Sequence, residues 1–255
     1  MAAEQQARVA VVTGAAGGIG AAIAARLAGQ GWRLVLSDRA GAALDQAVQA
    51  CREAAYAYAE ALPADVTRED DVAELVRHAV RRHGRLDGFV AAAGVAGTVR
   101  AVEEYPADVF QQVLGVNAVG TFLSLKHALP ALRAAGGGSF VALGSTSSIR
   151  GRAGLSGYVA SKHAVLGLVR TAALEQVGGA VRVNAVLPGP IQTAMIAAIN
   201  DMAAQAGPGG GVSRAVAAPY GEPGDVADAV AFLLSPAARH MNGSALVLDG
   251  GSTLA

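Results

Sequence analysis

The chain has 255 residues, which is enough for one large domain with a well-buried core. Twenty acidic and twenty basic residues cancel, and only 16% of the residues are charged. This balance argues against a nucleic-acid or other polyanionic partner.

The cysteine content and the lengths of the apolar runs bear on whether the protein has a disulfide, a zinc site or a membrane span. Cys51 is the only cysteine, so an internal disulfide is excluded, and no Cys/His cluster has the spacing of a zinc site. The start, Met1–Arg8, lacks the pattern of a signal peptide, and no uninterrupted apolar stretch reaches about 18 residues. We therefore expect no metal and no membrane span, and a cytoplasmic protein.

Short apolar runs bounded by turn residues alternate with helical patterns along the whole chain. Strands are predicted at Val9–Val12, Arg33–Leu36, Ala55–Ala59, Gly88–Ala92, Ser139–Leu143, Val181–Val186 and Ala245–Leu248. Helices are predicted at Ile19–Gly29, Ala42–Ala54, Arg68–His83 (with Thr67 as its N-cap), Pro106–Arg133, Gly157–Gln176 and Asp225–Ser235. This alternation predicts an α/β fold: a single domain, residues 1–255, with a parallel sheet covered by helices on both faces.

One break in composition occurs late in the chain. Residues 206–218 contain the run Gly207–Gly211, which is too flexible to continue a helix, and the apolar segment Met195–Met202 precedes it. We interpret residues 194–218 as a mobile flap over the substrate site, because too few residues follow it to form a second domain.

The first predicted strand leads into a glycine-rich turn, Thr13–Gly20. Glycine lets the backbone approach a phosphate, and the helix that follows offers free N–H groups at its start. The spacing is GxxxGxG rather than the GxGxxG of the dinucleotide fingerprint, and a ligand-free turn is the alternative. The position of this turn after the first strand favours nucleotide binding. The residues predicted to bind are Gly14, Gly17, Gly18, Ile19 and Gly20.

Acidic residues after the second and third strands bear on which nucleotide binds. Asp38 lies eighteen residues past Gly20, where a carboxylate accepts hydrogen bonds from the ribose of NAD and repels a 2′-phosphate. Arg39 is the opposing signal, because a guanidinium there could hold the phosphate of NADP. The pattern favours NAD, with NADP as the alternative. Asp65 could meet the adenine or simply stabilise a turn.

Tyr158 and Lys162 stand four residues apart, which on a helix places them on one face. An ordinary Tyr has a pKa of about 10 and is a poor proton-transfer group at neutral pH. A cation about 4 Å away, at an effective dielectric of about 20, could lower that pKa by roughly three units. The pair therefore indicates a general acid/base, although the same spacing also occurs by chance on helices.

The motifs Thr13-Gly14-x-x-x-Gly18-Ile19-Gly20 and Tyr158-x-x-x-Lys162, with Asp38 between them, resemble the short-chain dehydrogenase/reductase family, single-domain branch, over nearly the whole chain. The resemblance implies a Rossmann-type, doubly wound, seven-stranded fold. It also implies a catalytic Ser145 and an Asn117 that kinks a long helix and holds a relay water. The remaining implied cofactor residues are Val66, Ala93, Gly94, Pro188, Gly189, Ile191 and Thr193. The ending Leu248–Gly251 implies a homotetramer.

One segment departs from the family pattern. The family usually has Asn-Asn-Ala-Gly after its fourth strand, whereas this chain has Ala91-Ala92-Ala93-Gly94. The missing Asn side chains predict some loss of stability in the central sheet, without loss of activity.

The resulting prediction is an NAD-dependent oxidoreductase that interconverts a small secondary alcohol and a ketone, with Ser145, Ser147 and Tyr158 at the substrate. The pocket walls are predicted from Ser147, 150–155, Pro190, Ile191, Met195, Ile196 and the flap. Arg150 and Arg152 could anchor a carboxylate, but a solvated loop Arg is the favoured interpretation. The alternatives are an NADPH-dependent 3-oxoacyl-thioester reductase and a non-catalytic nucleotide-binding regulator.

Overall fold

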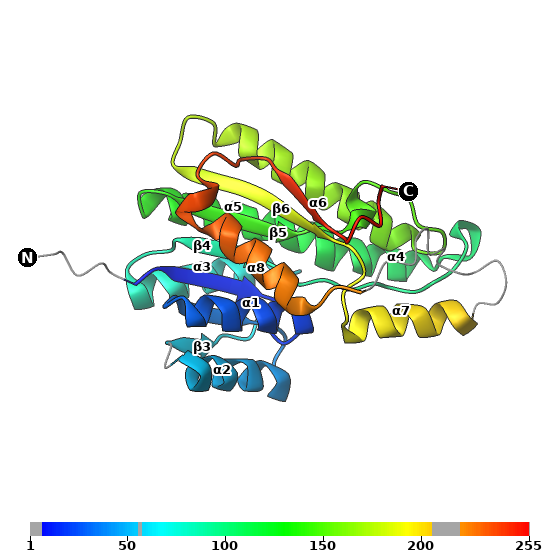
Figure 1. Ribbon diagram of the computed structural model, residues 1–255, viewed down its shortest axis with the longest axis horizontal. Helices are drawn as coiled ribbons and strands as arrows, with labels where there is room; N and C mark the ends of the chain where they lie inside the picture. The colour runs from blue at the N-terminus through cyan, green and yellow to red at the C-terminus, as the bar shows by residue number, and fades with distance from the viewer. Residues whose placement is uncertain (1–6, 56–57, 206–219, 255) are drawn as a thin grey trace, which may run out of the picture.

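The strands form one parallel sheet, shown in Figure 1. The computed structural model describes residues 7–55, 58–205 and 220–254, and the statements below concern those residues. The seven strands are β1 (Val9–Thr13), β2 (Arg33–Ser37), β3 (Ala59–Ala61), β4 (Gly88–Ala91), β5 (Gly138–Leu143), β6 (Val181–Pro188) and β7 (Ala245–Leu248). Their order is β3-β2-β1-β4-β5-β6-β7, and every pair is parallel. The predicted doubly wound, Rossmann-type fold is confirmed.

Helices cover both faces of the sheet because alternate strand residues point to opposite sides. Ala10 and Val12 pack in one core with α1 (Gly18–Gly29), α2 (Ala42–Ala55) and α8 (Pro223–Leu234). Val9 and Val11 pack in the other core with α3 (Glu69–His83), α5 (Gly120–Ala134) and α6 (Ser156–Glu175). The chain reverses its winding between β1 and β4, so a crevice opens outside the carboxyl ends of these strands.

Some predicted boundaries and elements differ from the structure. The third strand starts at Ala59 rather than Ala55, because α2 continues through the alanines to Ala55. The N-cap of α3 is Arg68, since the Thr67 hydroxyl donates to Asp65 instead of capping the helix. Part of the predicted flap is a helix, α7 (Ala194–Gln205), which buries Ile199 against Val99 and Leu155. Residues 206–219 of that flap lie outside the described residues.

The long predicted helix at Pro106–Arg133 is two α-helices. α4 (Ala107–Leu114) and α5 are joined by a single π-helical segment, Gly115–Val119. Such a π-bulge is where helices often carry a functional residue, and Asn117 lies inside it. The Asn117 carbonyl accepts a hydrogen bond from the Thr121 hydroxyl at 2.7 Å, which ties the bulge to the first turn of α5.

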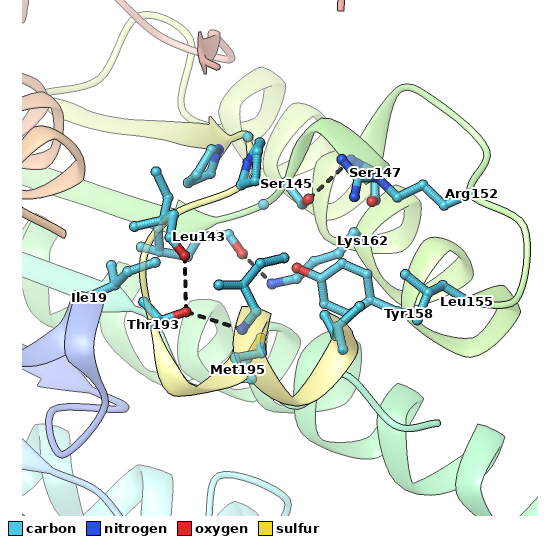
Figure 2. A pocket seen from close by; sticks show the side chains of 18 of the residues that line it. Ile19, Leu143, Ser145, Ser147, Arg152, Leu155, Tyr158, Lys162, Thr193 and Met195 are labelled. Atoms are coloured by element: carbon cyan, nitrogen blue, oxygen red, sulfur yellow. Dashed lines mark hydrogen bonds between the residues drawn. The ribbon is translucent and has the colours of Figure 1, made fainter. Parts of the chain in front are cut away.

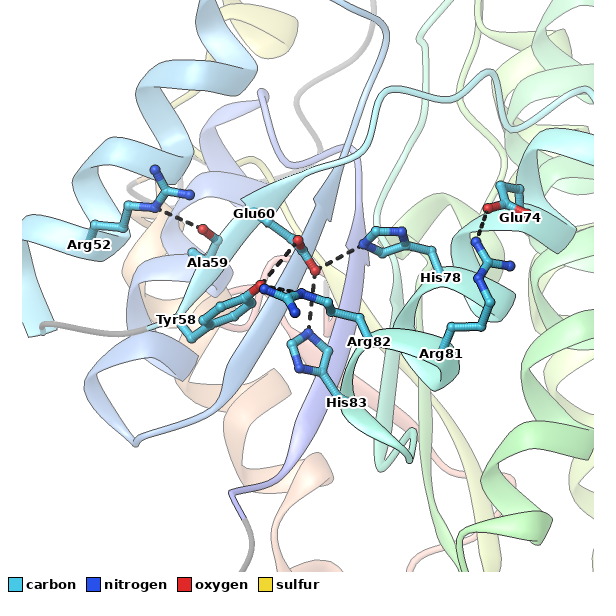
Figure 3. Close-up of polar contacts among 9 residues, drawn as sticks. All are labelled: Arg52, Tyr58, Ala59, Glu60, Glu74, His78, Arg81, Arg82 and His83. Atoms are coloured by element: carbon cyan, nitrogen blue, oxygen red, sulfur yellow. Dashed lines mark hydrogen bonds and ion pairs between the residues drawn. The ribbon is translucent and has the colours of Figure 1, made fainter.

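A carboxylate flanked by two histidines links β3 to α3 (Figure 3). Glu60 lies 3.0 Å from His78 and 3.3 Å from the buried His83, and accepts a hydrogen bond from the Tyr58 hydroxyl at 3.3 Å. Burial lowers the pKa of His83 below its ordinary value and outweighs the Glu60 charge, which raises it. His83 is therefore held in the neutral form by the fold.

We expect the His83 environment to make the fold sensitive to mild acid. The unfolded chain takes up a proton on this imidazole more readily than the folded chain does. The stabilising contribution is thus present above pH about 6.5 and lost as the pH falls through that value. Urea unfolding at a series of pH values checks this. A His83→Gln variant should lose less stability on acidification than the wild type, whereas a variant of the exposed His240, His240→Gln, should lose as much. Equal acid sensitivity in His83→Gln and wild type would contradict the prediction.

Candidate active site

The glycine-rich turn joins the end of β1 to the start of α1 with no space for side chains at two positions. Gly14 has φ 70°, and a Cβ there would stand 2.6 Å from the Ala93 nitrogen. At Gly20 a Cβ would stand 2.0 Å from the Gly14 carbonyl oxygen. The N-cap of α1, Gly17, has no side chain to bond the first amides. The turn therefore presents N–H groups at a helix start, which is a site for phosphate.

The Asp38 side chain lies next to this turn. Its carboxylate accepts hydrogen bonds from the Ala16 amide at 3.1 Å and from the Arg39 amide at 2.8 Å. The Arg39 side chain is exposed. A negative charge thus faces the space beside the glycine turn, where the adenosine ribose of a dinucleotide lies in this type of fold.

Asp65 and Val66 have local structural contacts. The Asp65 carboxylate accepts from the Thr67 amide at 2.9 Å and from its hydroxyl at 2.7 Å, and these hydrogen bonds lower the Asp65 pKa. Val66 is buried in a small cluster with Val72 and Leu123. This geometry is that of a turn-stabilising Asp, and neither residue lines the pocket described below.

Ser145, Tyr158 and Lys162 line one pocket of about 110 Å³, as Figure 2 shows. Tyr158 and Lys162 lie one turn apart on α6, with the Lys162 Nζ 5.6 Å from the centroid of the Tyr158 ring. The ammonium donates to the Leu143 carbonyl at the end of β5, at 2.7 Å. The sheet therefore anchors the lysine that the helix places beside the phenol.

Burial sets the pKa values of this pair. Burial raises the pKa of the Tyr158 phenol, while hydrogen bonding with Ser145 and the charge of Arg152 lower it. That Lys162 lowers the Tyr158 pKa stays a prediction. Burial lowers the pKa of Lys162 to about 8, because a desolvated ammonium is unfavourable.

The loop after β5 fixes the direction of the Ser145 hydroxyl. Ser145 is extended and caps the short 3₁₀ turn Thr146–Ser148: its Oγ accepts from the Ser147 amide at 3.1 Å. The Ser148 hydroxyl accepts from the Ser145 amide at 3.2 Å. The Ser145 hydroxyl hydrogen-bonds with the Tyr158 phenol in the pocket, whereas Ser148 serves the turn. These contacts distinguish serines that spacing alone leaves equivalent.

Asn117 lies close to Lys162, and its side chain holds the loop after β4. Its side chain accepts from the Val95 amide at 2.8 Å and donates to the Val95 carbonyl and to Ser161, both at 2.9 Å. A Cβ on Gly94 would stand 3.2 Å from the Asn117 Oδ1 and 3.7 Å from the Lys162 Nζ. Asn117 and Lys162 thus approach the same point, and a larger residue at position 94 would crowd both.

Thr13 provides a cross-link at the segment that lacks the family's asparagines. Its Oγ1 accepts from the Ala92 amide at 3.2 Å and from the Ala93 amide at 3.5 Å, and donates to the Val90 carbonyl at 3.4 Å. The buried Thr13 hydroxyl thereby ties the end of β1 to the end of β4. The loss of stability predicted from the missing asparagine side chains stays a prediction.

The rest of the pocket surrounds these polar groups with mainly apolar walls. The lining residues are Ile19, Ala92, Gly94, Leu143, Gly144, Ser147, Arg152, Leu155, Pro188, Gly189, Pro190, Ile191, Thr193, Met195, Ile196 and Ile199. Arg150 is not among them, because its guanidinium donates to the Ser252 carbonyl at 2.8 Å. Ile199 lies within residues 194–218, the flap that the sequence predicts as part of the pocket wall. Leu143 and Gly144, at the end of β5, are lining residues that the sequence does not indicate.

Comparisons with known proteins agree with this geometry. Residues 14–253 match the family model described as enoyl-(acyl carrier protein) reductase. The cis-4-hydroxycyclohexanecarboxylate dehydrogenase of Sinomonas cyclohexanicum is 40% identical over 250 residues, covering 96% of each chain. The chain belongs to the short-chain dehydrogenase/reductase family.

Two further relatives of this short-chain dehydrogenase/reductase carry related activities. The cyclohexanol dehydrogenase of Acinetobacter sp. (strain SE19) is 37% identical, covering 96% of this chain and 95% of its own length. The crystal structure of an NAD+-bound xylitol dehydrogenase has a TM-score of 0.91 and 32% identity, covering 97% of this chain and all of the other. The predicted enzyme class is confirmed: the chain is an oxidoreductase that interconverts a secondary alcohol and a ketone.

Two expected absences can be compared only with the described residues. In residues 7–55, 58–205 and 220–254, none of the helices has the length and apolar character that crossing a bilayer requires. The same residues bring together no group of three His, Cys, Asp or Glu side chains able to hold a metal ion.

Proposed function

We propose that this protein oxidises a small cyclic secondary alcohol to the ketone with NAD+ as the hydride acceptor. The observation that carries the proposal is a single pocket that extends from Ile19, in the glycine turn, to Ser145, Tyr158 and Lys162. A nucleotide held on the turn and an alcohol held by the hydroxyls would therefore share one space.

The residues present fit a dinucleotide. Gly14 and Gly20 leave the turn without side chains, Asp38 offers a carboxylate to the adenosine ribose, and Thr193 and Ile191 line the other end of the pocket. We propose that Gly94, Ala93, Pro188 and Gly189 border the nicotinamide riboside. NAD+ supplies the electron-pair acceptor, and the protein supplies placement and electrostatics.

NAD is proposed over NADP on the charge at Asp38. A 2′-phosphate would bring its negative charge beside that carboxylate. The amides of Ala16 and Arg39 donate to the carboxylate and hold it in this position. Initial rates with NAD+ and NADP+ on one alcohol test this choice, with kcat/KM expected to favour NAD+. A preference for NADP+ would instead support the 3-oxoacyl-thioester reductase.

The protein's own groups define a path for the alcohol proton. We propose that Ser145 donates its hydroxyl hydrogen to the substrate oxygen and that Tyr158 takes the substrate proton as general base. Lys162 exchanges a proton with Tyr158, and the Asn117 and Lys162 side chains meet at Gly94. A water held by Asn117 would then carry the proton outward.

We expect opposite pH profiles for the two directions of the reaction. Burial lowers the pKa of Lys162 to about 8, so its ammonium loses a proton near that pH, while the Tyr158 phenol, whose pKa burial raises, is still protonated. Below that pH both are protonated and cannot accept a proton from an alcohol; above it one base is present. Therefore kcat/KM for oxidation should rise as the pH is raised through about 8, and kcat/KM for ketone reduction should fall. Flat profiles between about pH 6.5 and 9.5 would contradict this assignment.

The walls of the pocket support a small ring as substrate. Leu155, Ile191, Met195, Ile196 and Ile199 supply apolar surface around the hydroxyls. Relatives at 40% and 37% identity are named for cyclohexane-ring alcohols, which suits such walls. A panel of cyclohexanols, open-chain alcohols and polyols, followed at the absorbance of the reduced cofactor, tests the proposal. Better turnover of the open-chain compounds would contradict the choice of a ring.

Two expectations from the family resemblance stay predictions. A homotetramer is expected through the C-terminal strand, and light scattering of the purified protein measures it. A cytoplasmic location is expected from the cysteine content, and cell fractionation measures that.

A further inference from the structure

Arg152 is a half-buried cation in the wall of the active-site pocket. Within the described residues, its guanidinium has no hydrogen bond and no ion pair. Residues 206–219, outside that part of the chain, contain neither Asp nor Glu. Removing a charged group from water without giving it a partner is unfavourable. A functional role would explain why the Arg152 guanidinium lies in this position beside the reacting groups.

Arg152 differs in this respect from the other half-buried arginines of the described chain. Each of those has a partner that accounts for its position: Arg8 lies 4.1 Å over the Trp32 ring, Arg85 pairs with Asp87 at 2.6 Å, Arg150 donates to the Ser252 carbonyl, and Arg182 donates to the carbonyls of Ala238 and Ser235. The partner of Arg152 is therefore expected from outside the chain.

The pocket has an excess of positive charge. Among the described residues that line it, Arg152 and Lys162 are the two cations, and none is Asp or Glu. Lys162 is already bonded to the Leu143 carbonyl. The Arg152 charge is near enough to lower the pKa of the Tyr158 phenol. The free positive charge of the pocket thus comes from Arg152.

The position of Arg152 separates it from the cofactor end. In Figure 2 its side chain extends from the loop before α6 toward Ser145 and Ser147, on the side of Tyr158 away from Ile19 and Thr193. Ser147 belongs to the same wall, and its buried Oγ has no hydrogen-bond partner among the described residues. A molecule whose alcohol carbon faces the nicotinamide would place its opposite end beside Arg152.

We infer that Arg152 binds a carboxylate on the substrate, so that the preferred substrate is a ring hydroxy acid rather than a neutral alcohol. This inference rests on the proposed function. The guanidinium presents two parallel N–H groups that match a carboxylate, and pairing there gives the half-buried charge a partner. Arg152 is thus a specificity-determining residue, and the solvated-loop interpretation of its sequence position is replaced.

A binding experiment that needs no turnover tests the inference. The probes are cyclohexanecarboxylate and its uncharged counterpart, cyclohexanecarboxamide, titrated calorimetrically into the enzyme saturated with NADH. The proteins are wild type, Arg152→Met, Arg152→Lys and, as a matched control from the same loop, Arg150→Met. NADH binding, measured first, shows that each variant retains a folded cofactor site.

The wild type should bind the carboxylate at least about tenfold more tightly than the carboxamide. Arg152→Met should remove this preference, Arg152→Lys should keep part of it, and Arg150→Met should keep all of it. Equal binding of the two probes by the wild type would overturn the inference, as would a preference that survives in Arg152→Met or binding of neither probe.

Turnover separates this inference from the proposed function. With NAD+, the wild type should show a higher kcat/KM for cis-4-hydroxycyclohexanecarboxylate than for cyclohexanol, mainly through a lower KM. Oxidation of both without such a preference would leave the proposed function standing and overturn the role of Arg152. Tight carboxylate binding without oxidation of any alcohol would support Arg152 and contradict the proposed function.

Discussion

We expect Tyr158→Phe to lower kcat for alcohol oxidation by at least about 100-fold, the contribution typical of a general acid/base. The substitution removes one oxygen from a ring that lies against Lys162 and leaves the apolar body of the side chain in place. The glycine turn and Asp38 are unaffected, so the dissociation constant of NADH should change little. Stopped-flow single turnovers and NADH fluorescence titration measure the two quantities.

Tyr105→Phe is the matched control for this substitution. Tyr105 is a second phenol close by, packed against Gly157, and its buried hydroxyl has no hydrogen-bond partner among the described residues. Removing that hydroxyl leaves no group unsatisfied, so activity should stay near the wild-type value. Undiminished turnover in Tyr158→Phe, or an equal loss in both variants, would reject Tyr158 as the general base.

We expect Gly20→Ala to destabilise the protein by about 3 kcal/mol or more. The added methyl would stand 2.0 Å from the Gly14 carbonyl oxygen, which belongs to the backbone of the β1–α1 turn. The turn must shift to relieve the overlap, which also displaces the amides proposed to bind phosphate. Urea unfolding gives the loss of stability, and NADH titration gives the accompanying loss of affinity.

Gly29→Ala provides the comparison on the same helix. Gly29 is the exposed last residue of α1, and a Cβ there would meet nothing within 4 Å. Alanine has the higher helix propensity, so this variant should be as stable as the wild type or more stable by up to about 1 kcal/mol. If Gly20→Ala matched Gly29→Ala in stability, the turn would not be as tightly packed as described.

Groups that follow a regular period or end an element could be predicted from the sequence. Tyr158 and Lys162 share a helix face because their spacing fits one turn, and Asp38 ends a strand whose apolar residues identify it. These local signals suffice because the strands and helices are long and strongly patterned. The α/β fold could be predicted in the same way, from the alternation of strand and helix patterns along the chain.

Functional groups that irregular backbone places could be identified only from the family resemblance or from the structure. Ser145 lies in a short 3₁₀ turn and Asn117 in a π-bulge, and neither backbone form has a periodic signal in the sequence. Thr13 cross-links two strands that are 77 residues apart. The pKa values of Tyr158 and Lys162 depend on burial by residues from other elements, which spacing alone does not show. The same applies to Arg152, whose pocket position depends on how its loop packs.

The most direct test is to follow the hydrogen on the carbinol carbon. Cyclohexanol or cis-4-hydroxycyclohexanecarboxylate, deuterated at that carbon, is incubated with the enzyme and NAD+, and the reduced cofactor is analysed by mass spectrometry. We predict that the deuterium appears in the NADH together with the ketone, and that Tyr158→Phe slows its transfer. Ketone formation with unlabelled cofactor, or no oxidation of either alcohol with NAD+, would contradict the proposed activity.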